Sequence, residues 1–64
     1  MKLKGTIKWY NAKKGYGFIE SEDGDYFVHQ SALPEGTILN EGDKVSFEPV
    51  KTDKGKQAKN VEVK

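Results

Sequence analysis

Two short runs of this 64-residue chain combine aromatic rings with glycine and lysine in a pattern suited to nucleobase binding. They are Lys14-Gly15-Tyr16-Gly17-Phe18-Ile19 and Asp25-Tyr26-Phe27-Val28-His29. Side chains of an extended strand alternate between its two faces, so Tyr16 and Phe18 share one face of the first run. By the same rule, Phe27 and His29 share one face of the second. Side by side, these rings would form either a protein core or a platform on which bases stack.

Five short segments alternate apolar and polar residues, with turn formers between them. They are 3–10, 16–21, 25–29, 44–48 and 58–63. Asp23-Gly24 predicts a hairpin turn between the second and third segments, and 30–33 predicts a short helical turn. Asp53-Lys54-Gly55 is expected to interrupt a long last connection. The sequence therefore predicts an all-β fold, a small five-stranded antiparallel barrel, because closure removes exposed strand edges.

The face opposite the rings favours a platform over a core. Ile19 and Val28 alternate away from the aromatic residues. A small barrel has one interior, and filling it with the rings would bury the polar tips of Tyr16 and His29. Branched aliphatic residues and one phenylalanine are expected inside: Ile7, Ile19, Val28, Val45, Phe47, Val61 and Val63.

The sequence alone does not decide two features of the first two predicted strands. Strict alternation places Trp9 with Ile7 and turns Lys8 to the other face, so a platform that includes both Lys8 and Trp9 needs a bulge or twist there. Trp9 is therefore either core or platform. Gly15 and Gly17 indicate close approach by another backbone or a ligand, or else a tight bend.

Size and charge narrow the class of protein. One domain over residues 1–64 is expected, with a small core. The chain has no cysteine, no apolar run long enough for a membrane span and no secretory signal, so a cytoplasmic location is expected. Five lysines and no acid lie in 1–19, eight acids and one lysine in 20–48, and five lysines and two acids in 49–64. Lysines interleaved with aromatic residues are typical of a nucleic-acid binder.

Catalysis is not expected. The single histidine, His29, has no cysteine nucleophile and no motif that supplies an acid–base partner. A metal site is not expected either, since a second histidine and thiolates are absent from the sequence. No cofactor is implied.

The chain resembles the cold-shock domain family over nearly its whole length. The resemblance rests on an ordered set of motifs: residues 5–11, 14–19, 25–29, 31–33, 41–42, 45–48 and 57–58. It implies an OB-fold barrel that binds single-stranded RNA or DNA with little sequence preference, often as an RNA chaperone. The outward aromatic residues of the family map onto Trp9, Tyr16, Phe18, Phe27 and His29. Its polar contacts map onto Lys8, Asn11, Lys14, Asp25 and, more loosely, Ser31 and Lys54.

Three departures from the family pattern bear on affinity. Gln30 stands where an aromatic residue commonly follows the histidine, the loop at 36–39 lacks a further aromatic residue, and Lys56 stands where proline is usual. Because stacking contributes about 1–3 kcal/mol per base, a weaker and more salt-sensitive binder is expected. Gln30 is expected to hydrogen-bond a base edge, and Lys56 to add attraction for phosphate.

Single-stranded RNA or DNA is thus the expected partner, with no membrane partner, and a monomer is expected while a dimer stays open. One alternative is an RNA-recognition-motif domain, which would need two helices. The other is a small β-barrel that binds proteins through its aromatic face.

Overall fold

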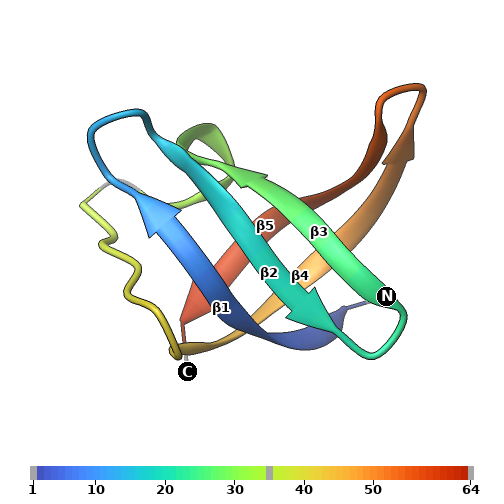
Figure 1. The fold of residues 1–64 in the computed structure, drawn as a ribbon, viewed down its shortest axis with the longest axis horizontal. Coiled ribbons are helices and arrows are strands. Elements are labelled where there is room, and N and C mark those ends of the chain that lie inside the picture. Colours follow the sequence, from blue (N-terminus) through green and yellow to red (C-terminus); the bar gives the residue numbers. More distant parts are fainter. Residues whose placement is uncertain (1, 35, 64) are drawn as a thin grey trace.

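The computed structural model describes residues 2–34 and 36–63, and its regular secondary structure is almost entirely β-strand (Figure 1). The strands are β1 (Leu3–Asn11), β2 (Tyr16–Ser21), β3 (Gly24–His29), β4 (Lys44–Thr52) and β5 (Gly55–Val63), with one 3-10 turn, η1 (Gln30–Ala32). In the described ranges η1 is the only helical element. The alternative of an RNA-recognition-motif domain, which needs two helices, is therefore wrong.

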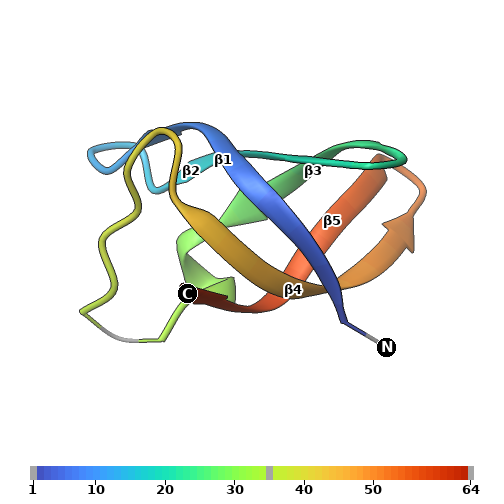
Figure 2. The same cartoon turned by 90° about the horizontal axis from the view of Figure 1, so that it is seen from below.

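The sheet closes into a barrel in the strand order β1-β2-β3-β5-β4. Neighbouring strands are antiparallel except for β3 and β5, which run parallel and pair through Phe27 and Gln57. Figures 1 and 2 show β1, β2 and β3 as one layer that crosses β4 and β5. The predicted all-β, five-stranded barrel is confirmed, with one parallel pair at its closure.

The interior contains all of the predicted residues except Val63, together with three more hydrophobic side chains. Ile7, Ile19, Val28, Val45, Phe47 and Val61 are buried, and they are joined by Tyr26, Leu39 and Ala58. Tyr26 corrects the expectation of an interior without polar tips. It alternates inward with Val28, and its hydroxyl, at the barrel wall, donates a 2.7 Å hydrogen bond to Oδ2 of Asp23. The hydroxyl is thereby satisfied, so the ring can be buried.

Val63 was predicted inside, and that prediction is wrong, because its side chain is 45% exposed. The residue lies at the end of β5 opposite Val45 of β4. The neighbour of β5 on its other side, β3, pairs with it only at Gln57. Val63 is therefore covered from one side only.

The last two strands are longer than the sequence indicates. β4 continues to Thr52 and β5 begins at Gly55, so the expected long connection is a tight hairpin turn. Pro49 lies within β4 opposite Ala58. The pairing of β4 with β1 ends at Phe47, so Pro49 lies on an edge where its missing N–H costs no hydrogen bond.

Candidate nucleic-acid interface

Five aromatic side chains lie together on the outside of β1, β2 and β3. We call this set the aromatic face: Trp9, Tyr16, Phe18, Phe27 and His29. Its members are half-buried or exposed, whereas Ile19 and Val28 on the opposite side of the same strands are fully buried. The predicted division between an aromatic outside and an aliphatic side facing the core is therefore confirmed for β2 and, except for the buried Tyr26, for β3.

The rings of the aromatic face touch one another in a compact group. Trp9 lies 5.6 Å from Tyr16 and 5.4 Å from Phe18, between ring centroids. Phe27 lies 5.9 Å from Tyr16, 5.8 Å from Phe18 and 6.5 Å from His29. The planes of Tyr16 and His29 are each inclined by 28° to that of Phe27. The rings of Tyr16 and His29 are thus each only moderately tilted from the plane of Phe27, which suits the stacking of flat bases.

Cross-strand register brings the rings together. Phe18 lies opposite Phe27, and Tyr16 lies opposite His29, in the antiparallel pair of β2 and β3. Directly opposed side chains of such a pair are close neighbours. The two-residue turn Glu22-Asp23 sets this register, one residue earlier than the predicted Asp23-Gly24, because Gly24 already pairs with Ser21 as the first residue of β3.

A β-bulge in β1 adds Trp9 to the group. Ile7 pairs with Ile19, but the next pair is Trp9 with Phe18, so Lys8 is the extra residue in β1. The extra residue breaks the alternation of the strand. Ile7 therefore stays buried while both Lys8 and Trp9 lie outside, and Trp9 is 37% exposed. The choice between core and platform for Trp9 is decided in favour of the platform.

Gly17 permits the close approach of β1 at this point. A Cβ added to Gly17 would lie 2.8 Å from Cα of Tyr10 and in contact with the carbonyl oxygen of Trp9. Both obstacles are backbone atoms, which cannot move aside like a side chain. Of the two readings of this glycine, close approach by a neighbouring backbone is the one that the structure supports.

Lys8 and Asp25 lie at one border of the aromatic face and form an ion pair. Nζ of Lys8 donates to Oδ2 of Asp25 over 3.0 Å, and both side chains are partly exposed. The hydrogen bond to Asp25 and the attraction of Asp25 and Glu20 raise the pKa of Lys8 above its ordinary value. The positive charge of Lys8 is thus already compensated by the protein.

The β1–β2 loop and the start of η1 carry three more predicted site residues. Oδ1 of Asn11 accepts hydrogen bonds from the backbone N–H groups of Lys13 and Lys14, each over 3.0 Å. The loop is therefore held by Asn11, and the side chain of Lys14 is exposed. Gln30 packs on Gly15, which has φ +77° and leaves room for the amide group. Asn11 has a structural role that its expected binding role did not include.

His29 ends β3 and caps η1. Its Nδ1 accepts a hydrogen bond from the backbone N–H of Ser31 over 3.2 Å and lies 3.0 Å from Oγ of Ser31. Ser31 thereby fixes the imidazole ring beside Phe27.

Lys54 reaches the aromatic face from the β4–β5 hairpin. It lines a groove of about 340 Å³ together with Phe18, Asp25, Phe27, Lys56 and Gln57. The β1–β2 loop that carries Lys14 and the hairpin that carries Lys54 lie at opposite ends of the barrel in both ribbon views (Figures 1 and 2). The two lysines are therefore not brought together but mark the two ends of the face.

Sequence reasoning did not include Gln57 among the site residues and did not foresee the contacts of Lys56. Gln57 lies in the groove because β5 pairs with β3 beside Phe27, a non-local pairing with no local signal. The ammonium group of Lys56 donates to the carbonyl oxygen of Asp23 over 2.6 Å and lies 4.7 Å from the centroid of the Tyr26 ring. It is directed to the β2–β3 turn, and its role as a phosphate contact stays a prediction.

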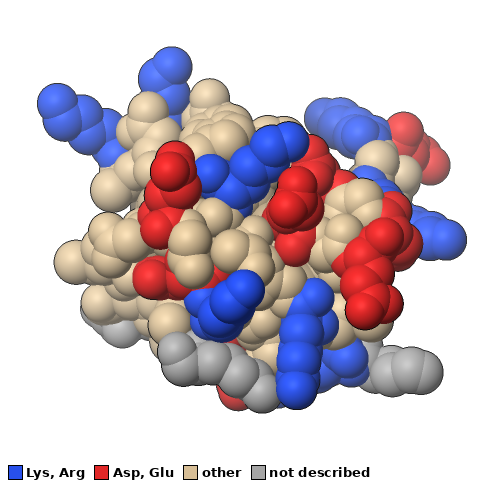
Figure 3. All heavy atoms as spheres, turned by 60° about the horizontal axis from the view of Figure 1, so that its bottom comes forward, with Lys and Arg blue, Asp and Glu red and all other residues tan. Residues whose placement is uncertain are grey.

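The surface charges are mixed rather than separated. On the face shown in Figure 3, lysines and acidic side chains lie close to one another. With a formal net charge of +1, the chain has no strong overall positive field, so attraction of phosphate depends on individual lysines.

Two further observations concern cofactors and membranes. In the ranges 2–34 and 36–63, no three His, Asp or Glu side chains are grouped as metal ligands require. None of the helical structure there has the length and apolar character of a membrane-crossing helix.

Known proteins resemble this chain in sequence and in fold. The family model described as the 'Cold-shock' DNA-binding domain matches residues 3–64. Cold shock protein 1 of Lactiplantibacillus plantarum is 55% identical over 60 residues, which are 89% of this chain and 91% of that protein. Cold shock protein CspC of Bacillus subtilis is 52% identical over 62 residues, covering 92% and 94% of the two chains.

A solved structure described as Drosophila Unr CSD456 superposes on the whole chain with a TM-score of 0.82 at 19% identity, a likeness of fold. This chain spans 27% of its length. The match over residues 3–64 and the identity to curated relatives agree with the motifs around the aromatic face. The chain therefore belongs to the cold-shock domain family, a family of nucleic-acid-binding domains.

Proposed function

We propose that this chain binds single-stranded RNA or DNA with low sequence specificity, by stacking bases on its aromatic face. The observation that carries the proposal is the grouping of five rings outside a barrel whose interior is filled by other residues. Each base offers a flat π-surface, so stacking tolerates any sequence. A duplex hides these surfaces, so single strands are favoured and RNA secondary structure is discouraged. This is the activity of an RNA chaperone.

Lysines at the two ends of the face supply the attraction for phosphate. Lys14 and Lys54 have exposed side chains, and Lys13 lies beside Lys14 in the β1–β2 loop. A strand that crosses the aromatic face between the loop and the hairpin would meet these cations in turn. Binding releases counterions from the nucleic acid, with a salt slope of about −0.7 for each phosphate neutralised on a single strand. Three contacts give a slope of about −2.

The binding unit is one domain over residues 1–64, acting as a cytoplasmic monomer without catalysis or cofactor. Affinity is lower than in a family member with a full set of rings. Gln30 and the loop at 36–39 carry no aromatic side chain, and each missing ring removes a stacking surface. Gln30, held on Gly15 at the end of the face, is placed to hydrogen-bond the edge of a base.

Titration with oligothymidylate tests the proposal through the fluorescence of Trp9, the single tryptophan of the chain. We expect quenching that saturates and weakens as salt is raised. The matched variants are Phe27→Ala on the aromatic face and Val63→Ala at the end of β5, where Val63 is 45% exposed. Phe27→Ala should lower affinity, whereas Val63→Ala should leave it unchanged. Equal affinities for both variants would contradict stacking on this face.

A protein-binding module remains the second candidate, because exposed aromatic residues are also enriched at protein interfaces. A featureless titration with oligothymidylate and oligouridylate, from a chain with an intact fold, would favour it.

A further inference from the structure

Lys8 differs from Lys14 and Lys54, the lysines at the two ends of the aromatic face, in having a close acidic partner. Its ammonium group lies 3.0 Å from Oδ2 of Asp25. Among the described residues, ion pairs are formed by Lys2, Lys8 and Lys56. Lys14 and Lys54 form none with those residues. A phosphate can therefore approach Lys14 or Lys54 without displacing a protein carboxylate, which is not the case for Lys8.

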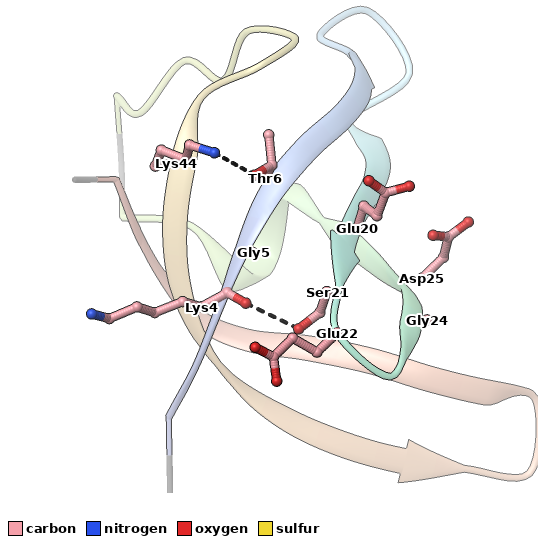
Figure 4. Close-up of a pocket in the computed structure, with 9 residues that line it drawn as sticks. All are labelled: Lys4, Gly5, Thr6, Glu20, Ser21, Glu22, Gly24, Asp25 and Lys44. Carbon is pink, nitrogen blue, oxygen red and sulfur yellow. Dashed lines mark hydrogen bonds between the residues drawn. The ribbon is translucent and has the colours of Figure 1, made fainter.

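A second carboxylate adds to the negative charge around Lys8. Glu20 of β2 lies directly opposite Asp25 of β3, and its charge also acts on Lys8. Figure 4 shows the carboxylates of Glu20 and Asp25 directed to the same side of these strands. Two carboxylates and one ammonium group leave this border with a net negative charge. A phosphate that took Lys8 from Asp25 would lie beside two uncompensated carboxylates, an unfavourable arrangement.

Asp25 in turn faces the place where a base would stack. It lines the groove formed with Phe18 and Phe27, and Lys8 occupies only its Oδ2 atom. Within the described residues, Oδ1 of Asp25 has no hydrogen-bond partner. An ionised carboxylate only accepts hydrogen bonds. A base stacked on Phe18 or Phe27 would therefore be held at its edge through an N–H group.

We infer that Lys8 is a positioning residue for Asp25 and not a phosphate ligand. The inference rests on the proposed function and refines it: the ion pair holds the carboxylate at the groove, where it accepts a hydrogen bond from an N–H group of the stacked base. Alternation from the buried Ile7 places Lys8 on the outside of β1, within reach of Asp25. Lys14 and Lys54 then account for the contacts with phosphate.

The test compares Lys8→Met with Lys14→Met, two substitutions that keep the length of the side chain and remove the charge. Two readouts are measured for each: the salt slope for oligothymidylate, and the ratio of its affinity to that of an oligonucleotide of N3-methylthymine. The methylated base can stack but has no N–H at its edge. Asp25→Ala measures the part of the ratio that depends on the carboxylate, and Lys8→Arg retains the ion pair.

For Lys14→Met we expect the salt slope to fall in magnitude by about 0.7. The preference of this variant for oligothymidylate over the N3-methylated oligonucleotide should be unchanged. In the wild type we expect a preference of about tenfold for oligothymidylate over the N3-methylated oligonucleotide, the value typical of a hydrogen bond to a charged group. For Lys8→Met we expect an unchanged salt slope and a large loss of this preference. Lys8→Arg should restore the preference. Asp25→Ala should lose it to the same extent as Lys8→Met, and the double variant should lose no more.

A slope that falls by about 0.7 in Lys8→Met would identify Lys8 as a phosphate ligand and overturn the inference. An unchanged preference in Lys8→Met would overturn it as well. Both results require a wild-type chain that binds oligothymidylate. A wild-type chain that binds neither oligonucleotide contradicts the proposed function itself, so the two failures are distinguishable.

Discussion

Trp9 of β1 lies against Phe18 of β2, with 5.4 Å between their ring centroids, because the bulge at Lys8 makes these two residues cross-strand partners. Without the extra residue, Trp9 would share the inward side of Ile7, which is fully buried. The bulge thus adds the largest ring of the chain to the outside of the barrel without disturbing its interior. Aromatic residues on the outside, such as Phe18, are therefore expected to bind bases, whereas the buried Phe47 stabilises the fold. This difference leads to the first prediction.

Phe18 and Phe47 should respond in opposite ways to truncation. Phe18→Ala removes a stacking surface and should weaken oligothymidylate binding by about 1–3 kcal/mol, with the fold retained. Phe47 is fully buried, so Phe47→Ala should destabilise the domain by about 3–5 kcal/mol, enough to unfold a chain of this size. Fluorescence titration and urea unfolding measure the two effects. Unfolding of Phe18→Ala at the same urea concentration as Phe47→Ala would show that Phe18 is a core residue.

Gly17→Ala should destabilise the domain by about 1–3 kcal/mol, because the added methyl group meets the backbone of Trp9 and Tyr10. The emission of Trp9 should shift as β1 is displaced. Gly42→Ala is the matched control: Gly42 has φ +89° with no atom near its Cβ position. It should lose stability through backbone strain alone, by about 1–2 kcal/mol, and keep the emission of Trp9. An unshifted emission in Gly17→Ala would contradict the close approach of β1.

The contact between Asp23 and Tyr26 should make stability depend on pH. The hydrogen bond from Tyr26, and secondarily the charge of Lys56, hold the pKa of Asp23 below its ordinary value of 3.8. The folded state therefore favours the ionised carboxylate. Its stabilising contribution is present above the ordinary pKa and disappears as the pH falls through the lowered one.

Asp23→Asn keeps an acceptor for Tyr26 and removes the charge, so it isolates this effect. Urea unfolding should show the variant less stable than the wild type at pH 7, with the difference shrinking as the pH falls below about 4. The same hydrogen bond raises the pKa of Tyr26 above 10.0, so a further loss of wild-type stability is expected as the pH rises past that value. A difference between the two chains that stays constant down to the lowest pH would argue against the charge of Asp23.

Gln30→Phe should strengthen oligonucleotide binding. Gln30 lies at the end of the aromatic face next to His29, and a ring there would supply one more stacking surface, worth about 1–3 kcal/mol per base. The salt slope should stay the same because no lysine changes. Gln30→Leu serves as the control for apolar area without a stacking ring. Equal affinities of the Phe and Leu variants would mean that no base reaches this position.

Local patterns were sufficient to predict the strands and the division of faces for β2 and β3. Alternation separates Phe18 and Phe27 from Ile19 and Val28, and Asp23-Gly24 is a turn signal between them, so this hairpin depends on neighbouring residues only. The same alternation also pointed inward for Tyr26, which was nevertheless not included in the predicted core. Its partner, Asp23, is only three residues away, but the hydrogen bond between them depends on the shape of the turn.

The longer strands β4 and β5 could not be predicted in the same way. Residues 49–57 are mostly polar and contain a proline, so they lack the apolar alternation that marks a strand. They form strands because they pair with each other in a hairpin beyond the end of β1. Pairing with the other arm of the hairpin supplies the backbone hydrogen bonds, and no alternation of apolar side chains reports it.

By itself, the sequence of this chain determined which residues are available for stacking, where the chain turns and which family it belongs to, because these follow from residue types and short spacings. Only the tertiary structure decided that Trp9 lies outside, that Lys8 is paired with Asp25, and that Lys56 is directed to the β2–β3 turn. Each of these results depends on the register between strands, where a shift of one residue changes the face on which a side chain lies. Register is a property of the closed barrel as a whole.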